Sequence, residues 1–199
     1  MDGRVAHVLA ADVLGVEVPD TRPVFLAVLG VHVVAGLAAV LAGLVAALAG
    51  KRAGRHPQAG RVFLWALGVV AVTAAGLAVL RWPHDVHLLV LGVIAVACGL
   101  GGYTARRRRR PGWARRHILG MGGSYVVLLT AFYVDNGPQL PVWQLLPAWT
   151  FWVLPAMLGS PVIAAALRRY RARGWFTPAG PGQSGSAATP SPPAGTGPR

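Results

Sequence analysis

The stretch VFLAVLGVHVVAGLAAVLAGLVAALAG, from Val24 to Gly50, is the strongest indication of the fold class of this chain. It contains no charged side chain, and Lys51 and Arg52 follow it directly. About 20 consecutive apolar residues are enough for a helix to cross the hydrocarbon core of a bilayer. The stretch therefore predicts a transmembrane helix.

Four further stretches have the same character and contain no Asp, Glu, Lys or Arg. They are Val62–Leu80, Val86–Ala105, Ile118–Val134 and Leu145–Leu167. Only 13% of all residues are charged, against roughly a quarter in a soluble domain. The mean hydropathy is +0.52. We predict an all-α fold, a polytopic transmembrane bundle with five spans.

The basic residues are unevenly distributed between the predicted loops. With the N-terminus outside and the C-terminus in the cytoplasm, 16 of the 19 basic residues lie inside, and all six acidic residues lie outside. Arginine-rich loops normally stay in the cytoplasm, so this orientation is expected. We interpret the net charge of +13 in the same way and predict no nucleic-acid partner.

The remaining chain divides into two flanking segments. Residues 1–23 are expected outside the membrane; they carry no basic region typical of a cleaved signal peptide. Val5, Leu9 and Val13 have the spacing of a short interfacial helix. Residues 24–173 are expected to form the transmembrane domain. Residues 174–199 are rich in Gly, Pro, Ser and Ala, which predicts a disordered cytoplasmic tail.

Two helix faces are expected to point into the bundle. In the first span, Gly36, Gly43 and Gly50 recur every seven residues on the side that carries His32, and small residues let membrane helices pack closely. We expect two backbones nearly to touch at Gly43. In the fourth span a polar stripe is expected to face inward, and it comprises His117, Met121, Ser124, Leu128, Ala131 and Asp135.

The histidines are the main candidates for chemistry, because imidazole ligates haem and metals. His56 and His117 match in depth near the cytoplasmic side, and Met121 lies one turn beyond His117. His32 and His87 form a second pair nearer the outside, although their depths differ by roughly 8 Å at the rise of an α-helix. We favour interhelical or headgroup hydrogen bonding as the role of the histidines. Ligation of haem b by these residues is the alternative.

His32-x3-Gly36, His56-x3-Gly60-Arg61 and His117-x3-Met121-x2-Ser124-Tyr125 occur in this order along the chain. In this respect the sequence resembles a bacterial family of predicted membrane proteins, domain of unknown function 2306, over roughly residues 25–135. The resemblance implies a multi-pass protein of the bacterial cytoplasmic membrane, with no established reaction.

We therefore favour a non-enzymatic membrane bundle or subunit, with the lipid bilayer and a membrane protein or a second copy as partners. A b-type haem electron carrier is the first alternative. A small-molecule transporter is the second, because Pro147, Pro155 and Pro161 interrupt the fifth span and could form a hinge.

Overall fold

The computed structural model describes residues 11–13, 16–18, 23–49, 54–80 and 85–172. Within them the chain forms five long helices: α1 (Pro23–Leu48), α2 (Arg55–Leu80), α3 (Val86–Arg108), α4 (Trp113–Asn136) and α5 (Trp149–Ala172). All five are long and apolar enough to cross a membrane. The predicted all-α bundle of five spans is confirmed. The expected tail and Gly50 lie outside the described residues, and so do Val5 and Leu9 of the expected interfacial helix.

Two short strands precede the helices. β1 (Ala11–Val13) pairs antiparallel with β2 (Val16–Val18), with Ala11 opposite Val18. The helix expected to include Val13 is therefore wrong at that residue. The valines of the two strands, Val13, Val16 and Val18, favour extended backbone as much as they would fit an apolar helix face.

Most helices extend beyond the predicted apolar stretches. α2 begins at Arg55 and α4 at Trp113, so each includes polar residues before its apolar stretch. Hydropathy marks the part of a helix inside hydrocarbon, whereas the helix itself continues into the headgroup region. α5 begins four residues later than expected, because two 3-10 turns, η2 (Gly137–Gln139) and η3 (Trp143–Leu145), connect it to α4.

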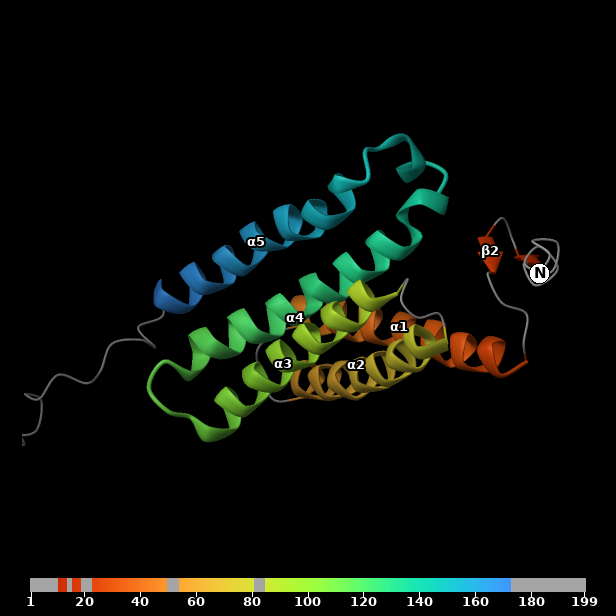
Figure 1. The fold of residues 1–199 in the computed structure, drawn as a ribbon. Coiled ribbons are helices and arrows are strands. Elements are labelled where there is room, and N and C mark those ends of the chain that lie inside the picture. Colours follow the sequence, from red (N-terminus) through yellow and green to blue (C-terminus); the bar gives the residue numbers. More distant parts are fainter. Residues whose placement is uncertain (1–10, 14–15, 19–22, 50–53, 81–84, 173–199) are drawn as a thin grey trace, which may run out of the picture.

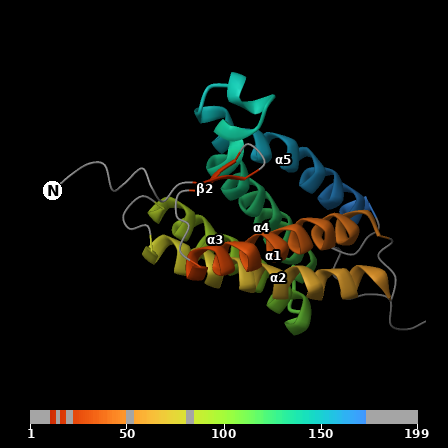
Figure 2. The ribbon, with the colours of Figure 1, turned by 90° about the vertical axis from the view of Figure 1, so that its right-hand side faces the viewer.

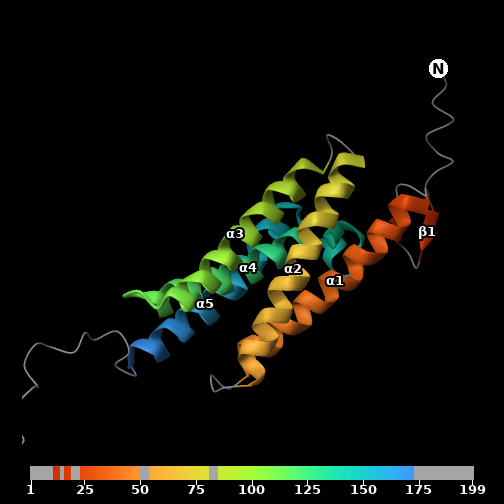
Figure 3. The ribbon, with the colours of Figure 1, turned by 90° about the horizontal axis from the view of Figure 1, so that it is seen from below.

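The helices alternate in direction, and each packs on the next along the chain. α1 and α2 form one antiparallel pair, and α3, α4 and α5 form a row beside it (Figures 1 and 3). The pairs α3–α4 and α1–α2 have the most extensive contacts, and α1 also contacts α4. Figure 2 shows the α4–α5 connection at one extreme of the molecule.

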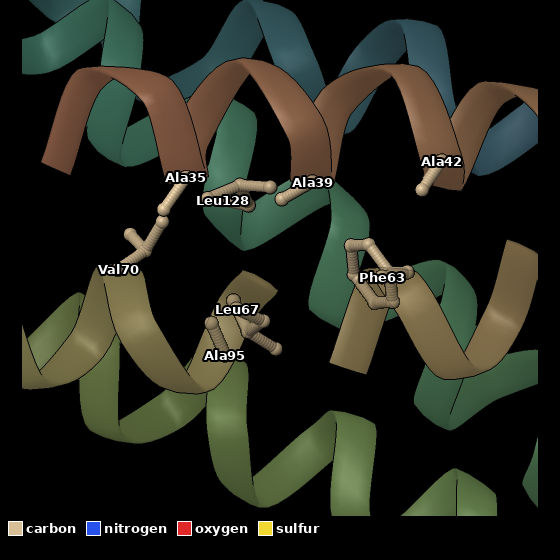
Figure 4. Packing of buried hydrophobic residues seen from close by; sticks show 8 residues of the cluster. All are labelled: Ala35, Ala39, Ala42, Phe63, Leu67, Val70, Ala95 and Leu128. Carbon is tan, nitrogen blue, oxygen red and sulfur yellow. The ribbon is translucent and has the colours of Figure 1, made fainter. Parts of the chain in front are cut away.

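The core lies where the two groups of helices meet (Figure 4). α1 contributes only alanines to it, so α2 can approach closely with its larger side chains. The buried cluster comprises Ala35, Ala39, Ala42, Phe63, Leu67, Val70, Ala95 and Leu128. Large apolar side chains elsewhere point outward: Trp65 is 80% exposed and Val72 is 74% exposed. Such a surface suits hydrocarbon and not water.

α5 continues through both of its internal prolines, Pro155 and Pro161. Gly159 of α5 lies against the Val126 side chain of α4, and Ile163 of α5 lies against Gly122. α5 thus packs along α4 both before and after Pro161. Its helical structure is not interrupted at the expected hinge.

Candidate functional site

His32 joins α1 to α2. Its Nδ1 lies 2.9 Å from the Thr73 hydroxyl, which itself donates to the carbonyl of Val69 at 2.8 Å or of Val70 at 3.0 Å. Because the hydroxyl proton is used on its own helix, Thr73 Oγ1 accepts from the His32 Nδ1–H. The bond spans 41 positions of sequence and fixes the two helices in register.

His56 joins the same two helices at their other ends. Its Nδ1–H donates to the carbonyl oxygen of Ala46 at 2.7 Å. Ala46 lies in the last turn of α1, where a helix runs out of N–H donors for its carbonyls. His56 therefore donates to a carbonyl at the C-terminus of α1 and caps this helix.

His117 joins α4 to α3. Its Nδ1–H donates to the carbonyl oxygen of Gly102 at 2.9 Å. A fourth polar bond connects α4 to α1, since the Tyr125 hydroxyl donates to the Val40 carbonyl at 3.1 Å. We call the bonds of His32, His56 and His117 the histidine ties.

The rings of His56 and His117 are adjacent, as their matched depth predicted. Their centroids are 6.3 Å apart, and their planes are nearly perpendicular at 82°. Both rings use Nδ1 for the bond to a carbonyl oxygen, so Nε2 is the other nitrogen of each ring. Two adjacent imidazoles are ligands of the kind that a b-type haem uses, whereas the described residues hold no group of three or more His, Cys, Asp or Glu side chains that could bind a metal ion.

The other tentative ligands have separate surroundings. His87 lies against Trp152 of α5, with 6.1 Å between ring centroids, whereas His32 is bonded to α2. His32 and His87, the second expected pair, thus contact different helices and not each other. Met121 packs on Gly102 and against the hydrophobic cluster.

The stripe of α4 that was expected to face inward is buried in the middle of the helix and exposed to solvent at the C-terminal end. Ser124 is fully buried and Leu128 is 7% exposed, but Asp135 is exposed at the end of the helix. Ser124 Oγ faces Gly99 and has no hydrogen-bond partner within the described part of the chain.

Among the glycines of the described residues, Gly102 and Gly120 mark a close approach of the α3 and α4 backbones. A Cβ at Gly120 would come within 2.6 Å of the Gly102 Cα and 2.7 Å of the Cys98 carbonyl oxygen. The expectation of such a contact at Gly43 is wrong, because the rings of Tyr125 and Phe63 fill the space there. A Cβ at Gly36 would meet nothing within 4 Å, so the expectation that Gly36 packs closely on a neighbouring helix is wrong as well.

Sequence reasoning missed the partners of the ties and this α3–α4 crossing. Ala95-x3-Gly99 and Gly120-x3-Ser124 carry the small-x3-small pattern of close membrane helix pairs and could have indicated the crossing. Backbone acceptors such as the Gly102 carbonyl leave no signal in a sequence, because every residue has one.

No family model, curated protein or solved structure shows significant similarity to the chain. Membership of the bacterial family that the sequence resembles therefore stays a prediction.

Proposed function

We propose that this protein is a non-enzymatic, multi-pass bundle or subunit of the bacterial cytoplasmic membrane, whose histidines hold neighbouring helices together. One observation carries the proposal: each of the three histidine ties joins one helix to an adjacent helix. Such bonds stabilise membrane helix pairs by about 0.6 to 2 kcal/mol each.

The proposed orientation places the N-terminus outside and the C-terminus in the cytoplasm. The α3–α4 turn and the C-terminal end of α5 lie at the same end of the row formed by α3, α4 and α5 (Figure 1). The arginines of the last turns of α3 and α5 are at this end. Because arginine-rich segments are retained in the cytoplasm, the shared location of these arginines supports a cytoplasmic position for this end of the bundle.

The partner of the outer surface is lipid, and we further propose that a membrane protein or a second copy covers part of it. Gly36 of α1 and Gly68 of α2 leave room for another helix, since a Cβ at either would meet nothing within 4 Å. Small residues at such positions are typical of helix–helix interfaces in membranes.

A b-type haem electron carrier is the second candidate, favoured by the adjacent rings of His56 and His117. Ligating histidines usually donate their other N–H to a carbonyl or carboxylate, as both of these do. Haem held by the two rings would supply one-electron chemistry. The chain would orient both imidazoles through the Ala46 and Gly102 carbonyls.

A reduced-minus-oxidised absorption spectrum separates the two functions. The protein is purified in detergent from cells supplied with haem, beside the double variant His56→Gln, His117→Gln. We expect no haem band in either sample, because the histidines serve as ties. A stoichiometric band in the wild type that the double variant lacks would establish the haem carrier instead.

A further inference from the structure

A small cavity lies at the α3–α4 turn, with a volume of about 140 Å³. The last turns of α3 and the first turns of α4 form its walls. It is lined by Gly101, Thr104, Ala105, Arg108, Arg110, Trp113 and Arg116.

The cavity is lined by positive charges, and no carboxylate of α3 or α4 lies close to them. Arg108, Arg110 and Arg116 all line it and are exposed. Asp85 and Asp135, the two carboxylates whose burial the structure describes, lie at the opposite ends of α3 and α4. An anion in the cavity would therefore meet three guanidinium groups and no nearby carboxylate from these helices.

The backbone of the turn brings these arginines together. Arg109 has a φ of 45°, the one left-handed non-glycine residue in the described part of the chain, and Gly112 has a φ of 74°. The chain thereby reverses within four residues between α3 and α4. Arg108 and Arg110 then lie across from Arg116, which is in the first turn of α4.

The cavity also lies at headgroup depth. The apolar part of α3 ends at Ala105, where the arginine run begins. Trp113 is half-buried against Tyr170 of α5, with 6.2 Å between ring centroids. Tryptophan concentrates at membrane–water interfaces, where its ring meets the headgroups.

We propose that this cavity binds the phosphate group of an anionic lipid. Guanidinium groups match phosphate oxygens in geometry and charge, and basic pockets between helix ends are typical headgroup sites. A zwitterionic lipid carries the same phosphate but offsets it with a cation, so it is expected to bind more weakly. The inference requires only that the helices span a bilayer, whichever role the histidines have.

Interleaved arginines of the turn provide a matched test. The pocket variant is Arg108→Gln, Arg110→Gln, and the control is Arg107→Gln, Arg109→Gln. Both remove two charges from one run, but Arg107 and Arg109 do not line the cavity, and Arg107 lies over the Tyr103 ring, 5.9 Å from its centroid. Native mass spectrometry of the full chain measures binding of phosphatidylglycerol, phosphatidylcholine and inorganic phosphate, and a melting curve confirms that each variant is folded.

We expect the pocket variant to weaken phosphatidylglycerol binding roughly tenfold relative to the control, because only the arginines that line the cavity can donate charge-assisted hydrogen bonds to the headgroup phosphate. Phosphatidylcholine binding should change little in either variant. Equal losses in both variants would refute the site and leave only diffuse attraction. Binding of inorganic phosphate without phosphatidylglycerol would refute the lipid as the ligand.

Discussion

At the scale of single residues, three histidines are placed as polar side chains inside a membrane bundle usually are, each with a hydrogen-bond partner. Each is half-buried among apolar helices, yet each donates Nδ1–H to a defined oxygen. A polar side chain without such a partner is costly in hydrocarbon, so the oxygens account for the tolerance of His32, His56 and His117. The spacing of the sequence indicated that His32 faces inward. It could not indicate Thr73 as the partner, because that contact depends on the register of α1 against α2.

The tie of His32 can be tested through its acceptor. Thr73→Val removes the hydroxyl with little change of shape and leaves the His32 donor without it. We expect a loss of about 1 kcal/mol in the free energy of unfolding, measured by titration with SDS. Thr130→Val is the control, since its hydroxyl bonds only to the Val126 carbonyl of its own helix. An equal effect of both substitutions would mean that the His32 bond contributes nothing particular.

At the scale of helices, α3 and α4 form the most tightly fitted pair. Gly102 and Gly120 let the two backbones touch, and Gly99 makes room for the Ser124 hydroxyl. This close approach also lets His117 reach the Gly102 carbonyl. The existence of both helices could be predicted from hydropathy. The sequence could not show that Gly102 and not Gly101 forms the contact, because the two are equally small and only the packing distinguishes them.

Substitution by alanine should change the free energy of unfolding in opposite directions at Gly101 and Gly102, two adjacent glycines of α3. A Cβ at Gly102 would lie 2.8 Å from the Met121 backbone nitrogen, so Gly102→Ala should force α3 from α4 and cost about 1 to 3 kcal/mol. A Cβ at Gly101 meets nothing within 4 Å, and Gly101→Ala should gain up to about 1 kcal/mol of helix propensity. Both are measured by the same SDS titration. A loss at Gly101 as large as that at Gly102 would contradict the assigned face of α3.

At the scale of the whole molecule, composition decided most of the architecture. Five uncharged apolar stretches predicted five helices, because lipid leaves few other ways to satisfy the backbone. The ends were less predictable: His56 proved to lie inside α2, because hydropathy does not register helix in the headgroup region. The adjacency of His56 and His117 followed from their matched depth, whereas the separate surroundings of His32 and His87 depend on how the helices pack laterally.

The central claim, five spans with their arginine-rich ends in the cytoplasm, is tested most directly by reporter fusions. An enzyme active only outside the cytoplasm is fused after Pro83, Arg110, Pro138 or Arg173, and a reporter active only inside is fused at the same positions. We predict outside activity after Pro83 and Pro138, and inside activity after Arg110 and Arg173, because the basic residues concentrate at the latter ends. The reverse pattern would contradict the orientation, and the same activity at two successive positions would show that the helix between them does not cross the membrane.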